Sequence, residues 1–265
     1  LQTTSGSIDF TTYTHALENV IRIELTTHED EAIKEWKWNP DKARSPRASL
    51  PQGRHITLQE YPENPPVKSL EKDGFSFSIQ QLLSGKCYVV AWRIWPHGHN
   101  KIVDITVALA DNEEQAIQEA KDTLNKFTSK SPSKRYKEHK MWWNDYYPTS
   151  YASFADAKTE SFYWTQMYKL ACLTRPDKFV IDLQGPWTNT TPWPATWWNL
   201  NVQLTYSPLF TGNRLDFSEP LWKALNENLE NLINNVPVEE WRVDAAGIGR
   251  SSSLDLVSPI RMDLV

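Results

Sequence analysis

Residues 192–203, PWPATWWNLNVQ, combine three tryptophans with two asparagines, and side chains of these types can hold a sugar. Seven of the chain's 13 tryptophans fall between Trp142 and Trp198, so the enrichment is local. Indole faces stack on the apolar C–H faces of sugar rings, and the amides of Asn and Gln both donate to and accept from hydroxyl groups. The pattern predicts a binding surface for uncharged carbohydrate.

Two polar side chains just before this stretch extend the candidate surface. Asp182 is suited to accept a hydrogen bond from a sugar hydroxyl, and we assign it no acid or base role. The candidate substrate-binding residues are Asp182, Gln184, Trp187, Trp193, Trp197 and Trp198. A single tryptophan more often fills a core, since large aromatic side chains are highly buried on average. Clustering among prolines and polar residues favours a site, so we expect residues 186–198 to line a concave surface with several indole faces accessible.

Length and charge limit the classes of partner. The 265 residues suffice for one large domain or two ordinary ones, and the net charge of −5 is mild. The sequence has no stripe of basic residues of the kind that binds nucleic acid. No apolar run approaches the roughly 20 residues that are needed to cross a membrane. We therefore expect no nucleic-acid partner and no membrane insertion. The chain begins at Leu1 without a signal-peptide pattern, which predicts a processed or trimmed polypeptide.

Cysteine and histidine give no sign of a metal or redox centre. Cys87 and Cys172 lie on different predicted elements, and we expect each to be a free, buried thiol. His97 and His99 flank Gly98 in a predicted turn without an evident third ligand, so a solvated hairpin tip is favoured over a metal site. The chain has no phosphate loop, nucleophile elbow or zinc spacing. We expect no cofactor and no metal.

Residues 1–111 alternate between apolar and polar side chains, as strands do. The alternation is clearest at Ile21, Ile23 and Leu25; at Phe75, Phe77 and Ile79; at Tyr88, Val90, Trp92 and Ile94; and at Val103, Ile105, Val107 and Leu109. Residues 39–66 are rich in Pro, Arg and Ser and predict a long irregular excursion. Several strands with short turns and no helix between them predict an antiparallel β-sandwich over residues 1–111.

The period becomes helical after residue 111. Asn112 and Gln115 predict a capped start for a linker helix within residues 112–133, and residues 134–265 predict an all-helical domain. One helix there is expected to carry His139, Trp142, Trp143 and Tyr146, and another to cover residues 156–173. The clearest amphipathic pattern, which predicts one helix ending before Pro237, is Leu221, Leu225, Leu229, Leu232 and Ile233.

Five short motifs resemble landmarks of the glycoside hydrolase family 95 (GH95) catalytic domain. They are HKMWW (139–143), SYAS (150–153), FYWTQMYKL (162–170), LQGPW (183–187) and WNLNVQLTY (198–206). The family includes inverting α-L-fucosidases and α-L-galactosidases. Its fold is an N-terminal β-sandwich, a helical linker and an (α/α)6 barrel. By motif the resemblance covers residues 120–225, and the β part agrees in architecture alone.

The resemblance implies a glycosidase that acts on polysaccharide side chains, and hence a secreted or periplasmic protein. In the family an Asn-x-Asn pair orients the attacking water together with an Asp, and a Glu is the general acid. Asn199 and Asn201 match that pair and are the candidate catalytic residues. Such amides can aim a water held between carboxyl groups about 6.5–9.5 Å apart. The alternative is an Asn pair that caps a helix start.

Two departures and two alternatives qualify the resemblance. Residues 204–207 read LTYS where the family has MNYW, which puts a fucose-like specificity in doubt. The family's acid and base lie beyond Val265, so we expect residues 134–265 to form part of an (α/α)6 toroid and the 265 residues alone to be inactive. One alternative is a non-catalytic carbohydrate-binding protein that uses the tryptophans as a platform. Another is a phosphorylase or lyase on a similar toroid, supported by fold analogy alone.

Overall fold

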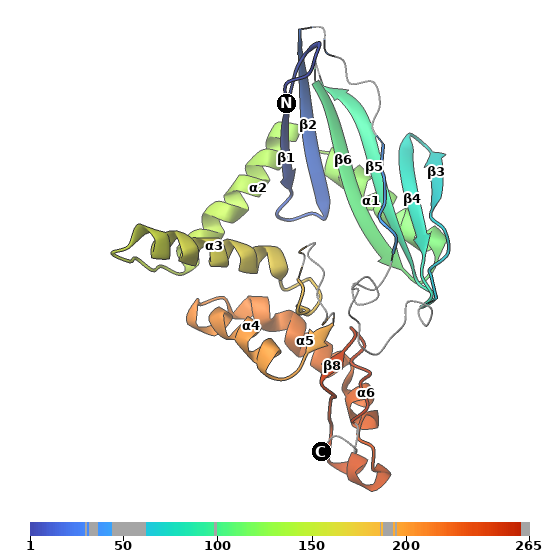
Figure 1. Cartoon of the computed structure of the whole chain (residues 1–265), viewed down its shortest axis with the longest axis vertical. Helices are drawn as coiled ribbons and strands as arrows, with labels where there is room; N and C mark the ends of the chain where they lie inside the picture. Colours follow the sequence, from blue (N-terminus) through green and yellow to red (C-terminus); the bar gives the residue numbers. More distant parts are fainter. Residues whose placement is uncertain are drawn as a thin grey trace. The chain divides into compact units, whose positions relative to one another are not determined.

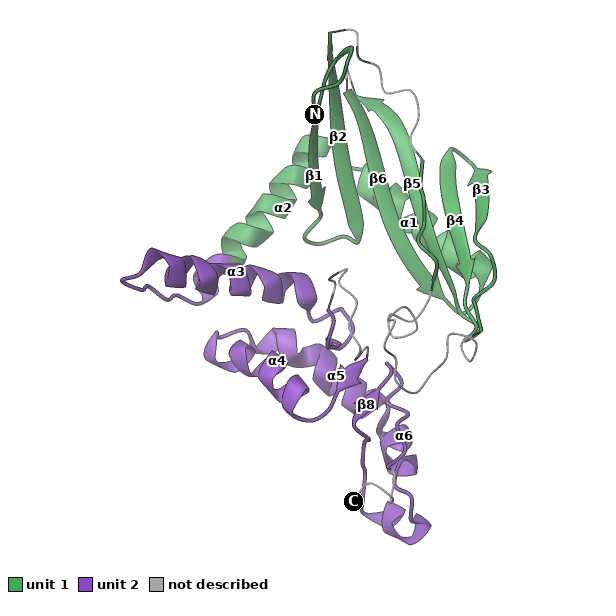
Figure 2. Cartoon of the chain, viewed as in Figure 1, with its two compact units in different colours: residues 1–44, 62–146 green, residues 45–61, 147–265 purple. Residues whose placement is uncertain are grey.

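The computed structural model describes residues 1–29, 31, 37–43, 62–97, 100–185, 187, 193 and 195–260. These residues fall into two compact units, of which the first ends at Tyr146 and the second begins at Tyr147 (Figure 2). Within the described residues no helix is both long and apolar enough to span a bilayer.

The first unit is built on one six-stranded sheet in which every neighbouring pair of strands is antiparallel (Figure 1). The strand order is β1-β2-β6-β5-β4-β3, so β6, the last strand in sequence, lies between β2 and β5. The strands are β1 (Gly6–Thr14), β2 (Val20–Glu29), β3 (Lys68–Lys72), β4 (Phe75–Gln81), β5 (Cys87–His97) and β6 (Asn100–Ala110).

Helix α1 (Glu113–Thr128) covers one face of this sheet and supplies the core. It begins at Asn112, whose side-chain oxygen accepts a hydrogen bond from the Gln115 N–H, as the sequence predicts. The core residues contributed by the helix are Ala116, Ala120, Leu124 and Phe127, and those contributed by the sheet include Val20, Phe75, Phe77, Ile79, Val89 and Ala91. The spacing of the helical residues is that of one buried stripe.

The opposite sheet face is apolar but only partly buried. Val90, Val103 and Ile105 are buried on it, whereas Ile94 and Val107 are 44% and 46% exposed. The predicted antiparallel strands are confirmed by the pairing of every neighbouring strand. The second sheet that a sandwich requires is not formed by the described part of residues 1–111, and the layer packed on the sheet is helix α1 instead.

A fully buried ion pair lies beneath helix α1. The guanidinium of Arg22 donates two hydrogen bonds to the carboxylate of Asp104, at 2.8 and 2.9 Å, and neither side chain is exposed. The indole N–H of Trp95 donates to the same carboxylate at 3.0 Å, and the guanidinium lies 4.7 Å from the centre of the Phe127 ring. The charge of Asp104 is thus paired and hydrogen-bonded, which a buried carboxylate needs.

Helix α2 (Pro132–Tyr146) carries the predicted His139, Trp142 and Trp143, and it is joined to α1 through one side chain. Arg135, which is buried, donates from Nε to the Phe127 carbonyl at 2.8 Å and from Nη2 to the Lys126 carbonyl at 2.5 Å. These carbonyls belong to the last turn of α1, where backbone acceptors otherwise lack partners.

His15 lies in the turn between β1 and β2, and its neutral imidazole hydrogen-bonds to the backbone of helix α2. Its Nε2–H donates to the Arg135 carbonyl at 3.1 Å, and its Nδ1 accepts from the backbone N–H groups of Leu17 and Glu18, both at 3.2 Å. Because Nδ1 is an acceptor, a proton there removes two hydrogen bonds. Burial lowers the pKa of His15 below its usual value of 6.5.

We expect acid to weaken the first unit through His15. Because its folded pKa is lowered, the unfolded chain binds the proton more readily, so the stability from neutral His15 is complete above pH 6.5. That stability falls as the pH drops below 6.5 towards the folded pKa. Urea unfolding at pH 7.5 and pH 5 should show a larger loss for the natural chain than for His15→Gln. Equal losses in the two chains would contradict the assignment.

The second unit is mainly helical, with one small two-stranded sheet. Its helices are α3 (Ala157–Leu173), α4 (Leu200–Thr211), α5 (Glu219–Glu227) and α6 (Leu229–Asn234), with 3-10 turns η3 (Tyr147–Thr149), η4 (Leu215–Ser218) and η5 (Glu239–Val243), and its strands are β7 (Thr196–Trp197) and β8 (Ser251–Ser252). Asp156 caps α3 through the Thr159 N–H, and Leu173 is its last residue, so the helix predicted over residues 156–173 is confirmed.

Two expectations for this unit differ from the structure. The single amphipathic helix predicted from residues 221–233 is two helices, α5 and α6, because the backbone leaves helical geometry at Asn228 (φ −110°, ψ 22°). The four α-helices of the described residues 147–260 do not close into a barrel. A helical arrangement after the sheet is established, and a toroid is not.

Candidate functional site

The tryptophan-rich segment is anchored by the small sheet. Strand β7 pairs antiparallel with β8, with Thr196 opposite Ser252 and Trp197 opposite Ser251. Trp198 extends the link, because its backbone N–H donates to the Arg250 carbonyl and its indole N–H donates to the Ser252 hydroxyl, both at 2.9 Å. Thr196 and Ser252 are buried, so this pairing fixes the last part of the segment against residues 250–252.

The indoles differ in how much they are exposed. Trp187 is 43% exposed and Trp193 is 54% exposed, whereas Trp197 and Trp198 are half-buried. The rings of Trp193 and Trp197 lie 5.6 Å apart at 50° to each other. Accessible indole surface is therefore confirmed at Trp187 and Trp193. Residues 186, 188–192 and 194 lie outside the described residues, so the concave surface expected over residues 186–198 stays a prediction.

Asp182 and Gln184 shape the turn that presents Trp187. Asp182 accepts a hydrogen bond from the Gly185 N–H, and Gln184 donates its side-chain amide to the Trp187 carbonyl at 2.8 Å. Gly185 has a φ of +61°, and a side chain there would collide with Leu173. Both predicted sugar-contacting side chains thus have a structural task within the turn itself.

Tyr206 ties this turn to helix α4, a link that the sequence pattern did not reveal. Its hydroxyl is buried and accepts a hydrogen bond from the Ile181 N–H at 3.0 Å. The Leu183 N–H donates to the Ala195 carbonyl at 3.1 Å, which joins the turn to the tryptophan-rich segment. The turn, the segment and helix α4 are consequently linked by hydrogen bonds. The sequence around Tyr206 gives no sign of this hydrogen bond, because only the fold brings the tyrosine next to Ile181.

Asn199 and Asn201 lie at the start of helix α4, and both are exposed. Asn199 is the N-cap residue, but its side chain makes no capping hydrogen bond, and its backbone φ and ψ of −100° and −38° are helical. An Asn that caps a helix normally has extended backbone angles and uses its side-chain oxygen on the next turn. The Asn199 amide is therefore not used for capping. Asn201 lies within the first turn, where its carbonyl accepts from the Thr205 hydroxyl at 2.7 Å.

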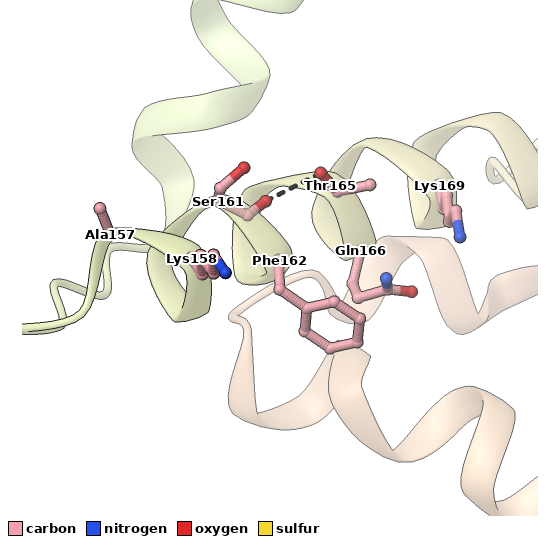
Figure 3. Close-up of a pocket in the computed structure, with 7 residues that line it drawn as sticks. All are labelled: Ala157, Lys158, Ser161, Phe162, Thr165, Gln166 and Lys169. Atoms are coloured by element: carbon pink, nitrogen blue, oxygen red, sulfur yellow. Dashed lines mark hydrogen bonds between the residues drawn. The ribbon is translucent and has the colours of Figure 1, made fainter.

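An open cavity of about 510 Å³ lies beside helix α3 (Figure 3). Its lining residues are Ala157, Lys158, Ser161, Phe162, Thr165, Gln166 and Lys169. The Lys169 ammonium also lies 5.9 Å from the centre of the Trp187 ring, so the cavity and the tryptophan-rich region share a side chain. Sequence reasoning placed Phe162 and Lys169 within a family motif but gave them no role. Their shared helix face, at spacings of three and four residues, is the signal that would have found the groove.

The carboxylates near the chain's end are committed to local structure. Asp255 accepts hydrogen bonds from the Ser253 hydroxyl and, at 3.1 Å, from the Val257 N–H. Asp244 ends the short 3-10 turn η5. Within the described residues no hydrogen bond or ion pair joins either of them to Asp182. The described residues contain no group of three or more His, Cys, Asp or Glu that could hold a metal ion.

Histidine and cysteine were assigned from sequence with mixed success. Both cysteines are free, and Cys87 is buried as expected, but Cys172, in the last turn of α3, is exposed. His97 ends strand β5 and packs its ring 5.9 Å from that of Trp95. Gly98 and His99 of the predicted hairpin tip lie outside the described residues.

Comparisons of the chain with protein-family models, with curated proteins and with solved structures find no match.

Proposed function

We propose that this chain binds oligosaccharides or polysaccharides through its tryptophan-rich region and belongs to an inverting glycoside hydrolase of the α-L-fucosidase and α-L-galactosidase type. The observation that carries the proposal is the exposure of Trp187 and Trp193 in a unit that also exposes the amides of Asn199 and Asn201. Indoles stack on sugar rings, and amides bind hydroxyls or a water. A polysaccharide substrate implies a secreted or periplasmic protein.

The hydrolase part of the proposal rests on the Asn pair and the motif resemblance. An inverting glycosidase needs a water positioned opposite the leaving group. An uncharged amide can hold that water without competing with the carboxylate that takes its proton. The amide of Asn199 makes no capping bond, so nothing in the helix start requires an Asn there.

A second candidate function is saccharide binding without hydrolysis. The observation in its favour is that Asp182 and Asp255 both accept hydrogen bonds within their own turns. Hydrolysis of a glycosidic bond normally uses two carboxyl groups, one on each side of the bond. Turnover by the full-length protein separates the two functions, because binding is expected in both cases.

Replacing Trp187 or Trp193 by Ala is expected to weaken saccharide binding about tenfold, since truncating an aromatic anchor commonly costs more than 1 kcal/mol. The probes are neutral oligosaccharides that carry α-L-fucosyl or α-L-galactosyl side chains, titrated by calorimetry. Trp222→Ala is the matched control, because Trp222 is as exposed as Trp193, at 54%, but lies on helix α5. Equal losses in all three variants, or no binding by the natural chain, would overturn the proposal.

A further inference from the structure

The open face of helix α3 carries an aromatic ring between polar and cationic side chains. Lys158, Phe162 and Gln166 follow one another at four-residue steps, so they line one face, and Lys169 comes three residues later. Phe162 is 66% exposed although it is a large aromatic residue. Figure 3 shows Phe162, Gln166 and Lys169 on the same side of the helix. An exposed ring beside an amide and an ammonium is suited to a ligand with an apolar face and polar groups.

The charge of this groove is positive. Neither Lys158 nor Lys169 forms an ion pair with any described residue. The acidic residues at the start of α3 are engaged elsewhere: Asp156 caps the helix, and Glu160 accepts from the Phe154 N–H at 3.0 Å and from the Ser153 hydroxyl at 3.2 Å. Asp156 and Glu160 keep their negative charges, but neither lines the groove, whose lining holds two ammonium groups and no carboxylate.

The groove is continuous with the tryptophan-rich region through Lys169. This side chain is half-buried, and its ammonium lies 5.9 Å from the centre of the exposed Trp187 ring. A cation held against an indole is attracted by the ring's negative face, which orients the ammonium without neutralising its charge. A sugar chain bound at Trp187 thus has a cation within reach of its next residue.

We propose that the α3 groove binds a negatively charged sugar residue, one that carries a carboxylate or a sulfate, next to the sugar bound at Trp187. In this arrangement Phe162 contacts the sugar ring, Gln166 binds a hydroxyl, Lys169 binds the anionic group beside Trp187, and Lys158 adds a second positive charge at the other end of the groove. The inference rests on the proposed saccharide binding and adds the charge of the ligand. Two ammonium groups spread along three turns beside an exposed ring fit a single charged sugar better than a phosphate backbone, which needs more cations.

The test is a panel of immobilised oligosaccharides with a common backbone in neutral, uronic-acid-containing and sulfated forms. We expect the natural chain to bind an acidic form several-fold more tightly than the neutral form, and to lose that preference as salt is raised. Uronate and sulfate arms identify the anion. Lys158→Gln and Lys169→Gln should each reduce the preference, measured as the ratio of acidic to neutral affinity, by about two- to fivefold, the usual range for an exposed charge pair.

Two controls make the result specific. Lys169→Arg keeps the charge and should keep the preference, whereas Lys223→Gln removes an exposed charge that pairs with Glu227 on α5 and should change nothing. Equal binding of neutral and acidic forms would overturn the charged-sugar site and leave the proposed function intact. An acidic preference that survives both glutamine variants would also overturn it. No binding to any member of the panel would remove the proposed function itself.

Discussion

Asp104→Ala is expected to cost the first unit about 3–5 kcal/mol of stability, the usual penalty for removing one partner of a buried ion pair. The change leaves the Arg22 guanidinium buried beneath α1 without its counter-ion, and it removes the acceptor of the Trp95 indole N–H. Urea unfolding followed by far-UV circular dichroism measures the loss.

The matched control is Asp111→Ala. Asp111 pairs with Lys86 at 2.8 Å, the same distance, but the two side chains are 76% and 55% exposed. Removing it should cost far less stability than removing Asp104, because solvent and salt screen an exposed pair. If Asp104→Ala does not fold, the double change of Arg22→Met with Asp104→Leu should recover a folded chain, since it leaves no buried charge. Equal costs for the two alanine variants would contradict the role of the buried pair.

Asn199→Ala and Asn201→Ala are each expected to lower kcat by about 10²–10³-fold, with a much smaller change in KM. The reason is that an amide aiming the attacking water acts mainly in the transition state. The assay is steady-state hydrolysis of an aryl α-L-galactoside and an aryl α-L-fucoside by the full-length protein. Comparing the two substrates also tests whether LTYS at residues 204–207 disfavours fucose.

Thermal melting of the same variants distinguishes this role from a structural one. A capping Asn would cost about 1 kcal/mol on replacement by Ala. Because the Asn199 side chain makes no capping hydrogen bond, its alanine variant should melt close to the natural protein. A normal kcat with a lowered melting temperature would remove the residue from the mechanism. A full-length protein without turnover on either substrate would leave saccharide binding as the function.

Most helices and strands were predictable from neighbouring residues in the sequence, whereas the packing of α1 on the sheet depends on contacts between distant residues. Alternating residues in β4, β5 and β6 and the Asn112 cap of α1 are read directly from neighbours in sequence. The covering of the sheet by α1 was not predictable in this way, because a half-apolar strand packs equally well under a helix or another sheet. The break at Asn228 was missed because the leucine spacing continues across it.

The exposure of Trp187 and Trp193 was predictable from their place among prolines and polar residues, but the tasks of the polar side chains beside them were not. The sequence did not reveal that Asp182 and Gln184 are occupied by Gly185 and Trp187, because such turn hydrogen bonds depend on backbone angles. Nor did it reveal the contact between Lys169 and Trp187, which are 18 positions apart and meet only once the turn after α3 has formed.

Arg135 fixes the connection between α1 and α2 through hydrogen bonds to the end of α1. Arg135 lies in the first turn of α2, and its guanidinium donates hydrogen bonds to two carbonyls at the end of α1. Its positive charge therefore lies at the negative end of the α1 dipole. Helix α2 is consequently clamped to the sheet at its first turn, and at the same turn its Arg135 carbonyl is held by His15. A rotation of α2 away from this position would break the hydrogen bonds of Arg135 to α1 and to His15, so the first turn is the fixed end of the helix.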